Sequence, residues 1–429
     1  MKKVLLTTVA ALALAGPAYA SGSSSTVTQS NVGNSATVDQ VGAAIGSLST
    51  VTQSGASNSA NVSQADDGTD LGSTVPPSNI SDVNQSGDMN SANVTQNASI
   101  NIAPNESYVD QSGSSNAANI SQLDDENVSS VNQTSDNNVA NVSQGDAVAA
   151  LSDSSWGNTS SVDQAGMGSH FADVTQSGQQ NSSTVMQTGD GDSATVVQSG
   201  DVNSSWVNQT DESDTANVTQ SGDNNTSNVH QGGTNILATV DQSGDGNYSD
   251  VFQDSPGGVR PEDAVATVLQ SGDGNASFVN QRGNDSAVYV DQAGDMNTST
   301  ALAYGNRSRT DVWQWGDSNS SYVEQRAEDS WAQVAQLGDN NTASITQRED
   351  SPPTENFYAG IGQYGDNNSS TIEQDGDGHY ALNLQYGDGN LSTIMQTGST
   401  NSATVIQWTN ANSSIVTQSG TGNSASVSQ

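Results

Sequence analysis

Glutamine side chains recur about every eleven residues from Gln29 to Gln429, and amides spaced this regularly favour hydrogen bonding to one another over catalysis. The last seven of them, from Gln363 onward, are each eleven residues apart. A Gln side chain carries two N–H donors and a carbonyl acceptor, so identical amides placed one above another donate and accept along the stack. The chemistry predicted by this spacing is a continuous side-chain ladder that stabilises a repeated structure.

Each interval between two glutamines has the pattern of one strand and one turn. Counting from a Gln, the chain has Asn at the fifth position, a small residue at the seventh, Val or Ile at the ninth and the next Gln at the eleventh, as in 418–429. These positions share one side of a strand, and the Gly, Asp, Ser and Asn of the first four positions suit a turn. We therefore predict an all-β, cross-β-like solenoid of stacked strand-turn-strand rungs, with about 22 residues per rung.

The spacing predicts 34 strands, of which 33 end in Gln and one, near Ala303, does not. In strand 379–385, Asn383 takes the usual Val position and two leucines face outward, for which a local bulge is the expected explanation. One repeat domain is expected over 21–429. Loop insertions are expected near 41–52, 65–84, 97–110, 145–163, 254–269 and 348–362. The second and fourth of these either contain a decayed strand, around 71–75 and 147–151, or are looped out.

The first twenty residues have the pattern of a secretory signal peptide. Lys2 and Lys3 precede an apolar stretch over 4–15 and a small-residue cleavage site over 18–20. The apolar stretch is too short to span a membrane, so no membrane insertion is expected. We expect the mature chain to begin near Ser21 and to be exported.

The charge balance is strongly acidic, with eight Lys and Arg against 47 Asp and Glu and a net charge of −39. A surface of this kind repels nucleic acid and anionic lipid, so neither is expected as a partner. There is no cysteine, so no disulfide supports the fold. The composition alone is typical of a disordered chain, but Val and Gln stay in phase along it, which favours an ordered repeat.

The inward Val and Ile residues form only a narrow apolar seam, so backbone and amide hydrogen bonds must contribute much of the stability. Such ladders improve with length, and free strand edges leave backbone groups unpaired. The sequence runs to Gln429 on a predicted strand without a polar capping segment, whereas solenoids that remain monomeric normally cap their ends. These features predict end-to-end self-assembly.

Other residues with chemical potential have simpler interpretations. Gly-Asp turns such as 189–192 suggest calcium ligands, but solvated turns are the favoured explanation over specific calcium sites. The three histidines are far apart and are expected on the surface, and no Ser, His and Asp arrangement predicts catalysis. We therefore expect no enzyme activity, cofactor or specific metal site. Cross-strand packing, in preference to a carbohydrate-binding stripe, is expected for Trp206, Trp313, Trp315, Trp408, Tyr364 and Tyr386.

Segments such as 363–368 and 385–390, with Ser, Val or Ile and Gln at matching spacings, resemble the curlin repeat, which reads Ser-x5-Gln-x4-Asn-x5-Gln. The resemblance covers nearly all of the mature chain. That family comprises secreted bacterial fibre subunits that polymerise into curli, the functional amyloid of biofilm matrices. The resemblance implies a strand-turn-strand repeat, an extracellular or cell-surface fibre, and roles in adhesion and surface colonisation. It also implies partners: other copies of the chain, a nucleator subunit and an outer-membrane secretion apparatus.

The resemblance also implies which residues form the structural ladder. These are Gln29, Asn34, Gln40, Gln176, Asn181, Gln187, Gln220, Asn225, Gln231, Gln242, Asn247, Gln253, Gln363, Asn368, Gln374, Gln385, Asn390, Gln396, Asn401, Gln407, Asn412, Gln418, Asn423 and Gln429. The chain departs from the family in carrying far more repeats than usual. Its repeats also begin at Ser25, which leaves little room for a separate targeting segment after the signal.

Two further functional classes remain open. A monomeric β-solenoid adhesin, or a surface- or polysaccharide-binding rod, would need a flat face of one aligned residue type, whereas the outward positions here vary between repeats. A polysaccharide-cleaving enzyme of β-helix type would need clustered carboxylates or a basic residue on one face, and the sequence shows neither above its background.

Overall fold

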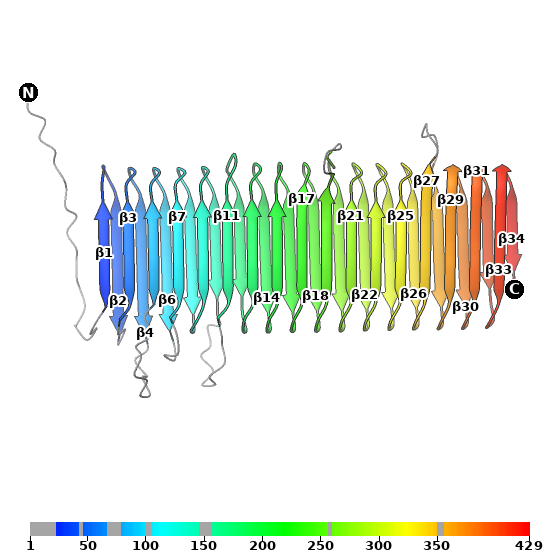
Figure 1. The fold of residues 1–429 in the computed structure, drawn as a ribbon, viewed down its shortest axis with the longest axis horizontal. Coiled ribbons are helices and arrows are strands. Elements are labelled where there is room, and N and C mark those ends of the chain that lie inside the picture. The colour runs from blue at the N-terminus through cyan, green and yellow to red at the C-terminus, as the bar shows by residue number, and fades with distance from the viewer. Residues whose placement is uncertain are drawn as a thin grey trace, which may run out of the picture. The chain divides into compact units, whose positions relative to one another are not determined.

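A computed structural model describes residues 23–42, 46–66, 79–98, 104–145, 157–255, 260–349 and 356–429. These residues form 34 strands joined by turns, and they contain no helix (Figure 1). The predicted all-β solenoid is thereby confirmed. No helix capable of crossing a membrane occurs in the described segments. The predicted signal peptide lies outside the described residues, as do both positions suggested for a decayed strand.

Contacts divide the chain into two compact units, 1–206 and 207–429, which we describe in turn. The strands of the first unit are β1 Ser24–Gln29, β2 Ser35–Gly42, β3 Leu48–Gln53, β4 Ser59–Asp66, β5 Ile80–Gln85, β6 Ser91–Ala98, β7 Glu106–Gln111, β8 Ala117–Leu123, β9 Val128–Gln133, β10 Val139–Gln144, β11 Thr159–Gln164, β12 Phe171–Gln176, β13 Ser182–Gln187 and β14 Ser193–Ser199. The chain passes from the first unit to the second within β15 Ser204–Gln209.

The second unit continues the same pattern. Its strands are β16 Thr215–Ser221, β17 Thr226–Gly232, β18 Leu237–Ser243, β19 Tyr248–Asp254, β20 Val265–Ser271, β21 Ala276–Gln281, β22 Ala287–Ala293, β23 Thr298–Ala303, β24 Arg309–Trp315, β25 Ser320–Gln325, β26 Trp331–Leu337, β27 Thr342–Glu349, β28 Tyr358–Tyr364, β29 Ser369–Asp377, β30 Tyr380–Tyr386, β31 Leu391–Ser399, β32 Ser402–Gln407, β33 Ser413–Thr421 and β34 Ser424–Ser428.

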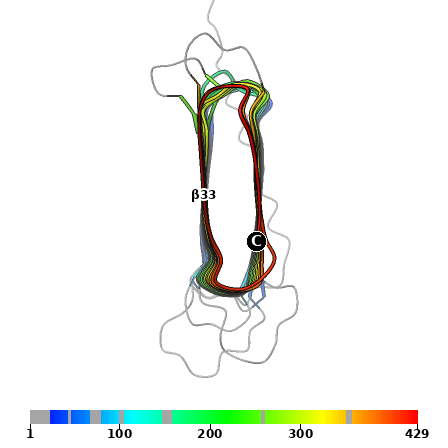
Figure 2. The same cartoon turned by 90° about the vertical axis from the view of Figure 1, so that its right-hand side faces the viewer.

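Within each unit, odd-numbered strands form one parallel sheet and even-numbered strands form another. Each strand pairs with the strand two places along the chain, so β3 pairs with β5 and β4 with β6. One odd and one even strand face each other across a narrow interior and make up one rung (Figure 2). Because β3 and β4 pair directly with β5 and β6, both sheets stay continuous across the long interval between β4 and β5.

The pairing is in register, so equivalent repeat positions form columns along each sheet. Val51 pairs with Val83 in one sheet, and Val62 pairs with Val94 in the other. All four side chains are almost fully buried. The small residue of the repeat differs between the sheets: it is usually Ser in odd strands, such as Ser129, and Ala in even strands. The core is therefore a thin seam of buried Val columns and buried Ser or Ala columns.

Glycine in the turns is required by the closeness of the next rung. Gly222 and Gly244 adopt φ of 94° and 100°, in the left-handed region that favours glycine. A Cβ atom on Gly222 would lie 2.3 Å from the carbonyl oxygen of Gly244. The turn glycines thus permit stacking at strand spacing.

The bulge expected around Asn383 is wrong. Strand β30 pairs residue for residue with β28 and β32, and Asn383 stands between Ile361 and Val405 in the buried column. The Asn383 Nδ2 donates to the Ser370 hydroxyl across the rung at 2.5 Å. Backbone register therefore outweighs the cost of burying one amide in an apolar column.

Candidate functional site

The glutamine of each repeat forms a column of side-chain hydrogen bonds in each sheet, interrupted at Ala303, which we call the Gln column. Gln53 donates from Nε2 to Oε1 of Gln85 at 2.8 Å, and Gln85 donates to Gln111 at 2.8 Å. In the second unit, Gln242 donates to Gln270 at 2.8 Å. All these glutamines are almost fully buried, so the bonds form in a low-dielectric interior where an unpaired amide would be costly.

The same glutamines also cross the interior. The second N–H of Gln53 donates to the Ser35 carbonyl oxygen at 3.0 Å, and that of Gln85 donates to the Ser59 carbonyl oxygen at 3.0 Å. Each acceptor is the first residue of a strand in the opposite sheet. A Gln therefore joins neighbouring rungs and also ties the two strands of a rung together, a role that the spacing alone did not indicate.

The Gln column has a direction. The column bonds run from the Nε2 of one Gln to the Oε1 of the Gln in the rung that follows along the chain, as from Gln29 to Gln53 and from Gln396 to Gln418. At the β1 edge, Gln29 therefore directs an acceptor oxygen outward from its column. At the β33 edge, Gln418 directs donor hydrogens outward.

The asparagines form a second column by a different mechanism. The backbone N–H of Asn275 donates to the side-chain Oδ1 of Asn247 at 2.9 Å. The Nδ2 of Asn247 donates to the turn carbonyl oxygens of Ser243 at 3.2 Å and Gly272 at 2.8 Å. Amide-to-amide bonds also occur in this column, as between Asn297 and Asn275 at 3.1 Å. Asn thus mainly fixes the turn, and Gln forms the side-chain ladder.

The structure places the predicted ladder residues in these two columns, with burial that depends on position in the stack. The buried ones are Gln176, Asn181, Gln187, Gln220, Asn225, Gln231, Gln242, Asn247, Gln253, Gln363, Asn368, Gln374, Gln385, Asn390, Gln396, Asn401, Gln407 and Gln418. The more exposed ones are Gln29, Asn34, Gln40, Asn412, Asn423 and Gln429, all on rungs at the outer edges of the described stacks. The apolar column has the same gradient, since Val27 and Val427 are only half-buried.

One gap in the Gln column is compensated from the opposite sheet. Ala303 stands where the column needs a glutamine, between Gln281 and Gln325. The Oε1 of Gln325 instead accepts a hydrogen bond of 2.5 Å from the hydroxyl of Thr310, which occupies the small-residue position of the facing strand β24. Ala303 has no side-chain amide to donate to the Oε1 of Gln325, and the Thr310 hydroxyl supplies that hydrogen bond instead.

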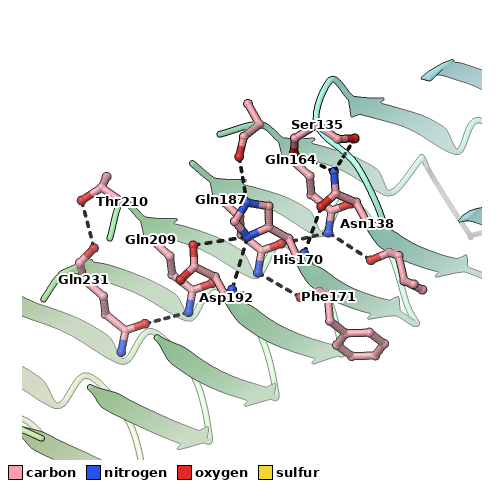
Figure 3. A network of polar contacts seen from close by, with 12 residues as sticks. Ser135, Asn138, Gln164, His170, Phe171, Gln187, Asp192, Gln209, Thr210 and Gln231 are labelled. Atoms are coloured by element: carbon pink, nitrogen blue, oxygen red, sulfur yellow. Dashed lines mark hydrogen bonds and ion pairs between the residues drawn. The ribbon is translucent and has the colours of Figure 1, made fainter. Parts of the chain in front are cut away.

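The expectation that the histidines lie on the surface is wrong for His170 and His379, each 1% exposed. Both replace Asn in the Asn column. The Nδ1 of His170 accepts from the backbone N–H of Asp192 at 3.3 Å, and its Nε2 donates to the Ala165 carbonyl oxygen at 2.7 Å (Figure 3). Burial lowers the pKa of His170 and of His379, which keeps each ring neutral. Each of these histidines stands six residues before the next Gln, which is the position that Asn occupies in most repeats. This spacing could have identified them as buried members of the Asn column.

Aspartates of successive turns form a third column, which we call the Asp column. The backbone N–H of Asp273 donates to Oδ1 of Asp295 at 2.9 Å, and that of Asp295 to Oδ1 of Asp317 at 2.9 Å. Asn410 supplies the equivalent oxygen to Asp388. Among the described residues, no group of acidic or histidine side chains has the arrangement of a metal site. In this column, one carboxylate oxygen of each Asp accepts a hydrogen bond from a backbone N–H of the neighbouring rung. The carboxylates therefore form a row along the turns.

Tyr364, Tyr386 and Trp408 pack across strands as expected. Tyr364 stacks on Tyr386 with ring centroids 4.9 Å apart, and Tyr386 stacks on Trp408 at 4.8 Å. The interplanar angles are 8° and 7°. These rings lie on the outer side of the even-numbered strands.

The Curlin associated repeat matches four segments of the chain, at residues 171–200, 263–294, 356–382 and 384–408. A search of curated proteins gives no match. The matched segments contain β12 to β14, β20 to β22, β28 and β29, and β31 and β32, so they include strand-turn-strand units from both halves of the chain. Four such repeats in a solenoid of in-register rungs support a curlin-repeat family protein with several repeats.

Proposed function

We propose that this protein is a secreted structural subunit that assembles end to end into extracellular amyloid fibres of the curli type. In this role the fibres would contribute to biofilm matrix, adhesion and surface colonisation by a bacterium. The working parts would be the Gln, Asn and Val columns together with the edge strands. Other copies of the chain would be the main partners, with a nucleator subunit and an outer-membrane secretion apparatus as further ones.

The observation that carries this proposal is the common direction of the Gln column. Gln29 offers an acceptor at the β1 edge, and Gln418 offers a donor at the β33 edge. A β33 and β34 edge can therefore continue its columns on the β1 and β2 edge of another copy, with the same hydrogen bonds that join rungs inside each unit. A head-to-tail contact of this kind produces an open filament.

Growth of purified protein on preformed seeds tests this proposal. The chain from Ser21 to Gln429 should convert to thioflavin-positive fibres without a lag when sonicated fibres of the same protein are added. A solution that stays monomeric after prolonged incubation with seeds would contradict the proposal and favour the second candidate, a monomeric adhesin or polysaccharide-binding rod.

An edge-blocking variant locates the growing surface. Val427→Asp places a carboxylate on the inward side of β34, where a docked rung would bury it, and should abolish growth from that edge. Ser426→Asp is the matched control, because it adds the same charge on the outward side of the same strand. Equal seeded growth of both variants would show that this edge is not the site of addition.

A further inference from the structure

The outer side of four neighbouring even-numbered strands in the second unit forms a continuous apolar surface, which we call the apolar face. It consists of the outward residues of β26, β28, β30 and β32 together with Trp408, which directly follows β32. Four of its aromatic side chains remain 37–58% exposed, namely Trp331, Tyr364, Tyr380 and Trp408. Leu382, Leu384, Tyr386 and Ile406 fill the positions between them.

The apolar face carries no charge. The outward positions of its four strands hold aromatic, aliphatic, glycine, serine, threonine and glutamine residues, with no Asp, Glu, Lys or Arg. In a chain of net charge −39, a charge-free surface lets two copies approach without placing carboxylates directly against each other. The corresponding face of the first unit is polar, since Asn93, Asn119 and Asn141 form a row of amide hydrogen bonds there.

The face is also closely packed before any partner arrives. Gly360 and Gly362 point outward yet are buried, because neighbouring side chains lie over them. A Cβ atom on Gly360 would lie 3.1 Å from Leu382, and one on Gly362 would lie 2.9 Å from Leu384. The two leucine side chains thus fill the space above the glycines. The surface is closely packed and needs little rearrangement on binding.

The ring geometry argues against a sugar as the occupant. Carbohydrate recognition by aromatic residues requires ring faces that are open to the ligand. Tyr386 has its two faces against Tyr364 and Trp408, at centroid distances of 4.9 and 4.8 Å, so the column offers ring edges outward. Ring edges at strand spacing suit interdigitation with a second surface that has the same spacing.

We propose that the apolar face docks against the apolar face of a second copy, so that fibres associate side by side. This inference rests on the proposed function as a fibre subunit. Four strands at ~4.8 Å and about seven residues at ~3.3 Å give roughly 440 Å² per copy, below the ~800 Å² per partner of a standard interface. Single copies should therefore bind weakly, whereas two fibres that present one face per subunit bind through many contacts at once.

A matched pair of charge insertions tests this docking surface. Thr404→Asp places a carboxylate within the apolar face on β32, and Thr393→Asp places one on the outer side of β31, in the other sheet. Both threonines are partly exposed. Electron micrographs of fibres in 0.15 and 1 M NaCl should show paired filaments for the wild type and Thr393→Asp, and single filaments for Thr404→Asp. Seeded elongation rates should be the same for all three proteins.

Three outcomes would overturn the inference. Wild-type filaments could be single at both salt concentrations, or the two variants could pair equally. Filament pairs that separate on addition of cellohexaose would instead assign the face to a sugar.

If no protein forms fibres, the proposed function fails, and sedimentation equilibrium in 1 M NaCl tests the face directly. A dimer weakened at least tenfold by Thr404→Asp but not by Thr393→Asp would support it, and equal dimerisation would refute it.

Discussion

At the scale of single residues, side-chain length separates the roles of the two amides. Gln reaches the next rung and the opposite strand at once, whereas the shorter Asn bonds mainly to backbone groups of its own and neighbouring turns. The regular spacing predicted both sets of positions. It did not predict how the hydrogen bonds divide between them, because the periodicity fixes the side of the strand and not the acceptor that an amide reaches.

Replacing one column glutamine should weaken the fold although little volume is lost. Gln253 donates to Gln281 at 2.8 Å and accepts from Gln231 at 3.1 Å. Gln253→Leu removes the amide that pairs with Gln231 and Gln281 and leaves a buried polar atom of each without its hydrogen bond. The free energy of unfolding should therefore fall by about 1–3 kcal/mol. Urea unfolding measures this loss. The outward Thr239→Ser, on the adjacent strand β18, serves as the control and should change the stability by less than about 0.5 kcal/mol.

The buried histidines give stability a pH dependence that asparagine would remove. Burial lowers the pKa of His379 below its ordinary value of 6.5, so the unfolded chain takes up the proton first as the pH falls. Stability from the neutral ring is therefore complete above pH 6.5 and is lost as the pH falls below it. His379→Asn should reduce the difference in urea midpoint between pH 7.5 and pH 5, relative to the wild type. Identical pH profiles for the two proteins would contradict this role.

At the scale of strands, register dominates local composition. The spacing predicted 34 strands, and the described residues form 34. Asn383 was expected to cause a bulge, but β30 keeps its register because seven consecutive residues pair with β28. The compensation of Ala303 by Thr310 could not be predicted, since it depends on which strands face each other across the rung.

This compensation predicts coupling between two positions that are seven residues apart in sequence. Thr310→Ala should destabilise the wild type by about 1–3 kcal/mol, because the buried Oε1 of Gln325 loses its donor. In an Ala303→Gln background, the restored Gln column supplies that donor, and the same substitution should cost much less. A double-mutant cycle by thermal unfolding measures the coupling, and additive effects would exclude it.

At the scale of the whole molecule, acidic turns oppose the association that the columns favour. The Asp column places like charges on successive rungs at strand spacing, which keeps separate copies soluble and slows their assembly. Repulsion between copies also follows from the net charge of −39. The engagement of one carboxylate oxygen by the next backbone N–H emerged only from the structure, since it depends on turn geometry.

Neutralising part of the Asp column should speed assembly without loss of stability. Asp295→Asn, Asp317→Asn and Asp339→Asn together keep the side-chain oxygen that each backbone N–H needs, as Asn410 already does. Seeded growth at low salt should be faster than for the wild type, and the acceleration by added NaCl should be smaller. Asp241→Asn, on an outward strand position, is the single-site control. Unchanged kinetics of the triple variant would show that turn charge does not limit assembly.

Copies that add rung by rung and keep their solenoid winding form filaments of a characteristic mass per length. The chain averages about 100 Da per residue, and about 22 residues per ~4.8 Å rung give about 4.7 kDa per nm. An amyloid in which each chain occupies one layer would give about 90 kDa per nm. Scanning transmission electron microscopy of unstained single filaments should give a value near 5 kDa per nm. A value near 90 kDa per nm would show instead that each chain occupies a single layer, and would exclude growth by stacked solenoid rungs.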